Sequence, residues 1–212
     1  MSVVIVDGGP RKNWNTAQML AKVAQGALSA GAEVEQFRLY DLQFKGCISC
    51  FACKRKGVVL ETCAQKDALL PVLQAAYKAD ALVLGSPVYF GEVTGMMRMF
   101  FERLCFPYLG HYDNKPSFYG REIPAAMVYT MNSFPAEFDL MHMTGVLARY
   151  QDVLGMLFGK PLELMATETY QFDDYSKYQS SSFDVAARKE RHDTVFPQDL
   201  QKAFDLGVSL VS

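Results

Sequence analysis

The chain has 212 residues, of which 50% are hydrophobic and 21% charged, a balance that supports a sizeable core and excludes an intrinsically disordered chain. Its net charge of −2 leaves no basic excess to neutralise a phosphate backbone, so we expect no nucleic-acid partner. Apolar runs such as residues 81–84 are too short to span a bilayer, and the N-terminus shows no basic region or cleavage signal. We therefore expect a cytoplasmic protein that does not associate with a membrane.

Short apolar runs alternate along the chain with longer segments of helical periodicity. The predicted strands are residues 3–6, 33–39, 81–84, 123–130 and 162–167. The predicted helices are residues 15–30, 67–78, 93–105, 136–157 and 198–210. Strands that alternate with helices predict an α/β fold, here a doubly wound, five-stranded parallel sheet between two helical layers.

The sequence contains no internal repeat and no linker, and it predicts a single domain over residues 1–212. A C-terminal extension, at about 168–196, precedes the final helix. Its stretch 170–183 mixes polar and aromatic residues, which indicates an ordered excursion or an interface arm rather than core.

The loop after the first strand, residues 7–16, leads directly into a helix. In an open α/β sheet, ligands bind beyond the carboxyl ends of the strands, and the start of a helix offers free N–H groups to an anion. Two glycines in this loop permit a sharp turn, and Arg11, Asn15 and Thr16 can donate to phosphate oxygens. The loop predicts a phosphate site, or alternatively a well-capped turn without a ligand. Its spacing matches neither a Walker loop nor Gly-x-Gly-x-x-Gly.

The segment after the third strand, residues 85–95, frames an aromatic pair with proline and glycine. Pro87 fixes the turn, and Tyr89 and Phe90 can pack against a flat ring. This segment predicts a site for a heteroaromatic ring, or alternatively an aromatic loop that closes the core.

Together, the two loops resemble those of the NAD(P)H-dependent FMN reductase branch of the flavodoxin-like superfamily. The resemblance rests on Gly-Gly-Pro-Arg-Lys-Asn-x-Asn-Thr after the first strand and Ser-Pro-Val-Tyr-Phe-Gly after the third, and it extends to the tail at 196–207. It implies a flavodoxin-like fold in which the first loop holds the FMN phosphate and the second packs the flavin ring. The implied cofactor-binding residues are Gly9, Pro10, Arg11, Asn13, Asn15, Thr16, Pro87, Val88, Tyr89, Phe90, Gly91, Met131, Asn132 and Ser133.

Two positions depart from the family pattern. Gly9 replaces the usual serine, which removes one hydroxyl donor to phosphate. Trp14 stands where glycine is common, so we expect a less compact loop there.

The resemblance also implies the activity and the partners. It implies an FMN-dependent oxidoreductase that accepts hydride from NAD(P)H and reduces a small acceptor such as a quinone or a flavin. Because the cofactor carries the chemistry, no protein acid or base is required, and we predict no catalytic residue. A homo-oligomer, either a dimer or a tetramer, is implied as well.

Four of the five cysteines lie close together in the sequence, at Cys47, Cys50, Cys53 and Cys63. Their spacing allows a [4Fe–4S] cluster, a four-thiolate zinc site, or reduced thiols in a partly buried loop. The neighbouring bases Lys54, Arg55 and Lys56 are expected to lower the pKa of nearby thiols. The stretch 46–54 resembles the cysteine motif of the iron–sulfur flavoproteins and of their cluster-free relatives. That likeness implies an alternative function, an electron carrier in which a ferredoxin-like donor passes electrons through the cluster to FMN.

Overall fold

The computed structural model describes residues 1–57, 61–110, 115–179, 181 and 184–211. Five parallel strands form the sheet in the order β2-β1-β3-β5-β6, and a short β4 pairs antiparallel with the end of β3. The strands are β1 (Ser2–Asp7), β2 (Glu33–Arg38), β3 (Ala81–Tyr89), β4 (Glu92–Val93), β5 (Ile123–Thr130) and β6 (Gly159–Ala166). The helices are α1 (Asn15–Ser29), α2 (Leu70–Lys78), α3 (Gly95–Cys105), α4 (Met143–Phe158), α5 (Val185–Thr194) and α6 (Phe196–Ser209).

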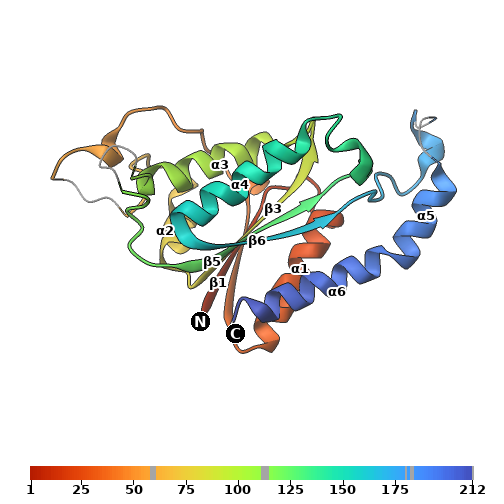
Figure 1. Ribbon diagram of the computed structural model, residues 1–212, viewed down its shortest axis with the longest axis horizontal. Helices are drawn as coiled ribbons and strands as arrows, with labels where there is room; N and C mark the ends of the chain where they lie inside the picture. Colours follow the sequence, from red (N-terminus) through yellow and green to blue (C-terminus); the bar gives the residue numbers. More distant parts are fainter. Residues whose placement is uncertain (58–60, 111–114, 180, 182–183, 212) are drawn as a thin grey trace.

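Helices cover both faces of the sheet, with α1 and α6 on one face and α2, α3 and α4 on the other (Figure 1). Side chains of β1 alternate between the two cores, so that Val3 and Ile5 pack with α1 and α6 while Val4 packs on the opposite face. Burial on both faces explains why the central strands are continuous apolar runs. The predicted three-layer α/β fold with a doubly wound parallel sheet is confirmed.

Several element bounds differ from those predicted. The strand predicted at 81–84 continues to Tyr89, because its last residues pair with β5 and β4. β6 begins at Gly159 instead of residue 162, because residues 159–161 already pair with β5. Pro161 is tolerated in this strand because β6 lies at the edge of the sheet. The helix predicted from residue 136 begins at Met143, because His142 adopts a left-handed conformation with φ 55°.

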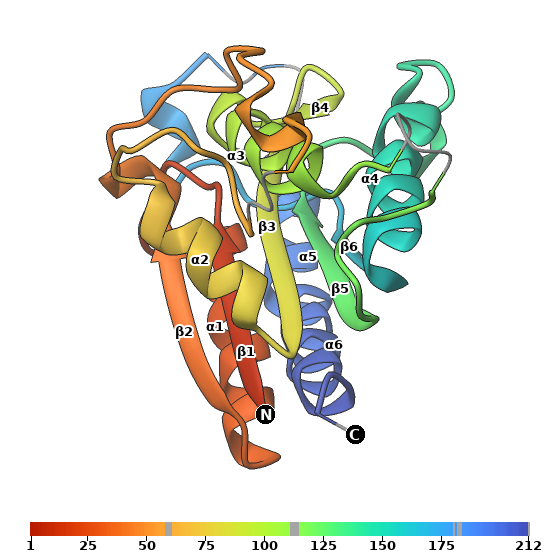
Figure 2. The same ribbon diagram turned by 90° about the vertical axis from the view of Figure 1, so that its left-hand side faces the viewer.

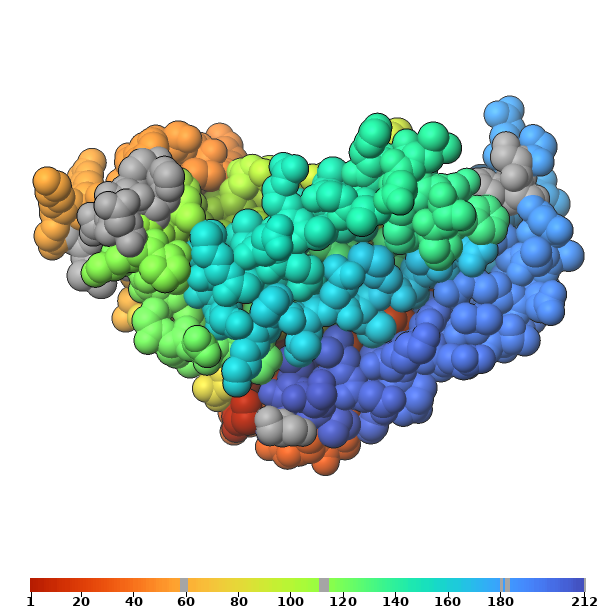
Figure 3. Space-filling model, viewed as in Figure 1, coloured from red at the N-terminus to blue at the C-terminus, as the bar shows by residue number. Residues whose placement is uncertain are grey.

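The C-terminal extension contains a helix that the sequence did not predict. This helix, α5, is capped by Asp184, whose carboxylate accepts a hydrogen bond of 3.0 Å from the Ala187 N–H. Residues 180, 182 and 183 of the extension lie outside the described residues. In the space-filling view the C-terminal segment forms one flank of the molecule, beside β6 (Figure 3). Within the described part of the chain, no helix has the length and apolar character needed to cross a bilayer.

The parallel strands end at one common edge of the sheet (Figure 2). Asp7 at the end of β1 lies opposite Gly85 of β3, and Pro87 of β3 lies opposite Thr130 of β5. The segments that follow these three strands therefore start side by side, as the site prediction required.

Helices α1 and α6 approach so closely that one position on α6 admits only glycine. A Cβ atom on Gly207 would lie 2.0 Å from the Val23 carbonyl oxygen, which is backbone and cannot turn aside. We therefore expect Gly207→Ala to lower the free energy of unfolding by about 3 kcal/mol through overpacking. Urea denaturation measures this loss.

Gly145→Ala in α4 is the matched control. A Cβ there meets no atom within 4 Å, so better helix propensity should raise stability by up to about 1 kcal/mol. Equal effects of the two substitutions would contradict the close helix crossing.

Candidate functional site

The loop after β1 is tied directly to the end of β3. The Gly8 N–H donates to the Gly85 carbonyl at 2.8 Å, and the buried Thr94 hydroxyl, at the start of α3, donates to the Gly8 carbonyl at 2.7 Å. A Cβ on Gly8 would lie 2.8 Å from the Met97 Cβ, so a side chain there would push the two segments apart. These contacts place the predicted phosphate loop and the predicted ring-binding segment against each other.

The start of α1 carries no side-chain cap. Trp14 occupies the cap position without making a capping hydrogen bond, and the first turn contains no acidic residue. The first bond of helical spacing runs from the Gln18 N–H to the Trp14 carbonyl at 2.8 Å. The N–H groups of residues 15–17 therefore lack an intrahelical acceptor, and they carry the positive end of the helix dipole. This terminus can bind an anion.

A cavity of about 310 Å³ opens at this terminus and extends to the end of β3. Its volume lies at the lower end of the range of small-molecule pockets, roughly 300–1,000 Å³. The predicted residues that line it are Gly9, Pro10, Arg11, Asn15, Thr16, Pro87, Val88, Tyr89, Phe90, Met131, Asn132 and Ser133. Two predicted residues lie outside the lining: Asn13, whose carbonyl accepts from Gln18, and Gly91, in the turn between β3 and β4.

Sequence reasoning missed one wall of the cavity. That wall consists of Thr169, Tyr170 and Gln171, which follow β6 and belong to the C-terminal extension. The polar and aromatic composition of residues 170–183 had indicated an ordered excursion or an interface arm. Trp14 also lines the cavity, and its indole N–H donates to the Tyr170 carbonyl at 3.0 Å, so the ring is held against this wall.

An ion pair between Asp7 and Arg38 supports the first loop. The Asp7 carboxylate accepts from the Gly9 N–H at 2.7 Å and from the Arg38 Nε at 3.3 Å. Burial raises the pKa of Asp7, although the Gly9 N–H and the Arg38 guanidinium act in the opposite direction. A Cβ on Gly9 would lie 2.9 Å from the Asp7 Oδ1, so a side chain at this position would have to displace the carboxylate.

The end of β3 and the turn to β4 form the aromatic side of the cavity. Phe90 and Gly91 have φ angles of 53° and 78°, as in the tight turns that connect hairpin strands. Phe90 is fully exposed and Tyr89 is 44% exposed, so the mouth of the cavity is open to solvent here. Burial raises the pKa of the Tyr89 hydroxyl, which stays protonated at neutral pH. On the β5 side, the Asn132 Oδ1 is buried and has no hydrogen-bond partner among the described residues.

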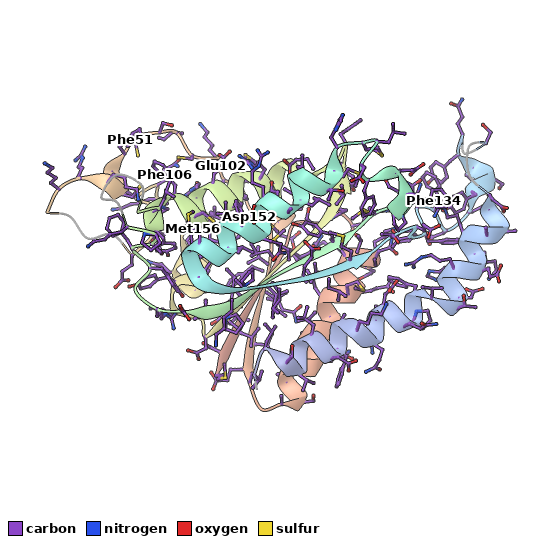
Figure 4. The ribbon with its side chains drawn as sticks, in the orientation of Figure 1. Phe51, Glu102, Phe106, Phe134, Asp152 and Met156 are labelled. Carbon is purple, nitrogen blue, oxygen red and sulfur yellow. The ribbon has the colours of Figure 1, made fainter. Side chains whose placement is uncertain are left out.

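A second and larger cavity, of about 490 Å³, lies between α3 and α4. Glu102, Phe106 and Met156, labelled in Figure 4, line it together with Cys47. None of the predicted cofactor-binding residues lines this cavity. The first cavity is therefore the one that combines the anion site with the aromatic wall.

The four clustered cysteines line one small depression, and all of them are free thiols. Cys63 is buried and Cys50 is exposed, and no three ligand groups of the described residues are arranged to hold a metal ion. The expectation that nearby bases lower the thiol pKa values is wrong for Cys53. Burial raises the pKa of this thiol and outweighs the charge of Lys54. The Lys54 ammonium instead donates to the carbonyls of residues 107 and 109, at 2.9 and 2.6 Å.

Arg103, which the sequence did not single out, anchors the cysteine loop. Its guanidinium is buried and donates to both Asp67 carboxylate oxygens, at 2.5 and 3.0 Å. It also donates to the Lys45 and Gln65 carbonyls, at 2.9 and 3.1 Å. Both ends of the loop are thus fixed to α3. Arg103 also lines the cysteine depression.

Comparison with known proteins points to one family. Residues 1–169 match the family model described as NADPH-dependent FMN reductase. An iron–sulfur flavoprotein of Archaeoglobus fulgidus is 35% identical over 112 residues, which are 53% of this chain and 53% of that protein. A second iron–sulfur flavoprotein of the same organism is 31% identical over 137 residues, or 65% of this chain and 58% of that protein. The chain thus spans about half the length of the curated relatives it matches.

Solved structures share the fold. An NAD(P)H:quinone oxidoreductase from Methanothermobacter marburgensis superposes with a TM-score of 0.68 at 16% identity, covering 100% of this chain and 98% of that one. An azoreductase from Bacillus anthracis superposes with a TM-score of 0.63 at 12% identity, covering 99% of each chain. At these identities the likeness shows a common fold alone.

The Arg103–Asp67 ion pair makes a prediction about stability and pH. Burial raises the pKa of Asp67, but the hydrogen bonds and charge of Arg103 outweigh it and hold the pKa below its usual value of 3.8. Asp67→Asn should lower the free energy of unfolding by about 2–3 kcal/mol. This loss is smaller than the loss expected on breaking a fully buried ion pair, because the Arg103 guanidinium keeps the Lys45 and Gln65 carbonyls as acceptors.

The difference in the free energy of unfolding between wild type and Asp67→Asn should have its full size above pH 3.8. It should shrink as the pH falls through the lower pKa that Asp67 has in the folded state, because the wild type then loses the carboxylate charge as well. Denaturation of both proteins at several pH values measures it. Asp193→Asn, which removes an exposed pair with Lys189, is the control and should change stability little. A difference independent of pH would contradict the ionic contribution.

Proposed function

The chain belongs to the NADPH-dependent FMN reductase family, and from this we propose that it is an FMN-dependent oxidoreductase that accepts hydride from NAD(P)H and reduces a small acceptor. One observation carries the proposal. The uncapped start of α1 and the aromatic end of β3 face the same cavity, so an anion site and a ring site lie side by side. A phosphorylated planar ring satisfies both.

The residues of the cavity fit FMN. The N–H groups of residues 15–17 and the Thr16 hydroxyl suit the phosphate, and Tyr89 and Phe90 suit the ring. The unpartnered Asn132 Oδ1 offers an acceptor to an N–H on the polar edge of the ring. When bound, FMN supplies the redox chemistry by taking up hydride from the nicotinamide and passing the electrons to a second molecule.

The protein's own part is to hold the ring and leave one side open. Among the described residues that line the cavity there is no carboxylate, histidine, lysine or cysteine. We therefore assign no catalytic acid or base. The exposed hairpin turn at Phe90 leaves a path through which nicotinamide and acceptor can reach the ring in turn. Tyr89 and Phe90 are positioning residues in this proposal.

A second candidate function, an iron–sulfur electron carrier with a ferredoxin-like donor, has one observation in its favour. Cys47, Cys50, Cys53 and Cys63 line a common depression, and four thiolates are the ligand set of a [4Fe–4S] cluster. The arrangement itself does not fit a cluster, because no three ligand groups among the described residues are placed to hold a metal ion. We derive no step through it.

The proposal includes a cytoplasmic location and a homo-oligomer. The five free cysteines support a reducing compartment. Exposed apolar side chains on the segments that border the cavity support an oligomer, because such patches mark interaction surfaces. These side chains are Phe90, Phe134, Leu140 and Met141.

The direct test is an absorbance spectrum, with iron analysis, of protein purified without oxygen, followed by addition of NADPH or NADH. We expect a yellow protein that is free of iron and bleaches rapidly with a reduced nicotinamide. A brown protein with about four irons per chain would select the electron carrier. A colourless protein that takes up no FMN would refute both.

Thr16→Val tests the phosphate end of the site. The substitution keeps the shape and removes a hydroxyl that lies 2.7 Å from the Thr130 hydroxyl. Because a hydrogen bond to a charged group contributes about 1.5–3 kcal/mol, FMN affinity should fall at least about tenfold while riboflavin affinity stays unchanged. Fluorescence titration measures both. Thr144→Val, on exposed α4 surface, is the control, and an equal loss for FMN and riboflavin would contradict the assignment.

A further inference from the structure

The depression that Cys47, Cys50, Cys53 and Cys63 line together has a chemistry of its own. The exposure of these thiols differs: Cys63 is buried, with 8% of its surface exposed, Cys53 is half-buried and Cys50 is exposed. All four are free thiols, and the described part of the chain places no three ligand groups around a metal ion. The depression shares no lining residue with the flavin cavity, so an inference about it does not rest on the proposed function.

The segment from Cys53 to Cys63 is held at both ends by one short 3-10 helix, Phe106–Tyr108. At its start, the Lys54 ammonium donates to two backbone carbonyls in and just after that helix, at 2.9 and 2.6 Å. Near its end, the Tyr108 hydroxyl donates to the Glu61 carbonyl at 2.7 Å. Because both ends are fixed to the same short element, the first and last cysteines of the segment are brought together.

Cys63 is a nearer neighbour of Cys53 than Cys47 is. The Phe51 ring packs edge-on against Phe106 at 5.6 Å and fixes the chain just before Cys53 (Figure 4). Burial is the main cause that raises the pKa of Cys53, and Cys63 adds to this rise more strongly than Cys47 does. Interactions between charges weaken with distance, so this order agrees with the anchoring of the segment.

Cys63 is the thiol that has hydrogen-bond donors beside it. Its Sγ accepts from the Gln65 Nε2 at 3.7 Å, and the same nitrogen donates to the Gly46 carbonyl at 3.3 Å. Burial lowers the pKa of Arg103, but hydrogen bonding and charge from Asp67 and Cys63 outweigh this effect and raise it, so the guanidinium stays charged. An amide donor and a buried cation both favour negative charge on the Cys63 sulfur.

The Arg103 guanidinium keeps one donor in reserve. Its two Nη atoms bond to Asp67 and to two backbone carbonyls, whereas its Nε is buried and has no hydrogen-bond partner among the described residues. A buried donor without a partner costs free energy, so it favours an acceptor atom that arrives beside it. Arg103 lines the depression, and none of the described residues that line it carries a carboxylate. An oxygen atom attached to the Cys63 sulfur would supply such an acceptor.

We propose that Cys63 is a site of reversible oxidation by hydrogen peroxide, and that Cys53 converts the oxidised form into an intramolecular disulfide. In the first step the Cys63 sulfur attacks one peroxide oxygen, the O–O bond breaks, and the thiol proton leaves with the other oxygen as water. The sulfur becomes a sulfenic acid. In the second step the Cys53 sulfur attacks the Cys63 sulfur, the S–O bond breaks, and the hydroxyl leaves with the Cys53 proton as water. The two thiols together give two electrons to the peroxide.

Exposure and local chemistry make opposite predictions about which thiol reacts. Exposure alone favours Cys50, because accessible thiols are generally oxidised first. The donors beside Cys63 favour the buried thiol instead. The small exposed fraction of Cys63 admits a molecule as small as hydrogen peroxide and hinders a bulky one such as glutathione disulfide. The order of oxidation therefore distinguishes a built site from a set of surface thiols.

The test treats the purified, reduced full chain with hydrogen peroxide and maps every cysteine by mass spectrometry. We expect the wild type to lose two of its five free thiols to a Cys53–Cys63 disulfide, which dithiothreitol reverses. Cys53→Ser removes the second thiol, so a sulfenic acid should accumulate at Cys63, where dimedone traps it. Cys63→Ser should abolish the disulfide and slow the loss of thiols at least about tenfold.

Cys50→Ser, which removes the most exposed thiol of the set, is the matched control and should change neither rate nor product. Gln65→Met removes a donor to the Cys63 sulfur at similar length, and it should slow dimedone trapping about threefold in the Cys53→Ser background.

Three results would overturn the inference: a disulfide that contains Cys50, an unchanged rate in Cys63→Ser, or iron bound at these thiols in the protein as isolated. None of the substituted residues lines the flavin cavity. Flavin binding by the same variants therefore reports separately on the proposed function.

Discussion

The site depends on the close approach of the first loop to the end of β3. The pairing of β1 with β3 sets this approach, the hydrogen bond from the Gly8 N–H to the Gly85 carbonyl continues it, and the Thr94 hydroxyl reinforces it from α3. Because Gly8 has no side chain, the loop can lie against Met97 without displacing α3. The start of α1 and the hairpin after β3 then open into one cavity, and the proposed flavin function follows from that juxtaposition.

The two ends of the cavity favour different kinds of ligand group. At one end, backbone N–H groups and the helix dipole favour negative charge, while the Asp7 carboxylate under the loop is paired with Arg38 at 3.3 Å. At the other end, Pro87, Tyr89 and Phe90 offer apolar surface near open solvent. Thr169, Tyr170 and Gln171 form a further wall, and the Trp14 indole N–H donates to the Tyr170 carbonyl in it.

The cysteine loop forms a separate unit at the other end of α3. Its position depends on Arg103, whose buried guanidinium connects the carbonyls and the carboxylate at the two ends of the loop. At Cys53 burial outweighs the charge of Lys54 and raises the thiol pKa, and the Lys54 ammonium donates to two backbone carbonyls. The loop is therefore organised mainly by a structural ion pair, and the flavin cavity shares none of the cysteine residues.

Sequence alone determined the layers of the fold and most of the cofactor cavity, because these depend on local signals. Apolar runs identify buried strands, glycine and cap residues identify the turns, and parallel topology brings the turns to one edge. Only the tertiary structure decided the cavity wall at residues 169–171, the role of Arg103 and the orientation of Lys54. Each depends on a hydrogen bond between residues far apart in the chain, such as Trp14 with Tyr170 or Arg103 with Asp67. No periodicity or spacing encodes such a partner, since any of many carbonyls and carboxylates could accept the same donor.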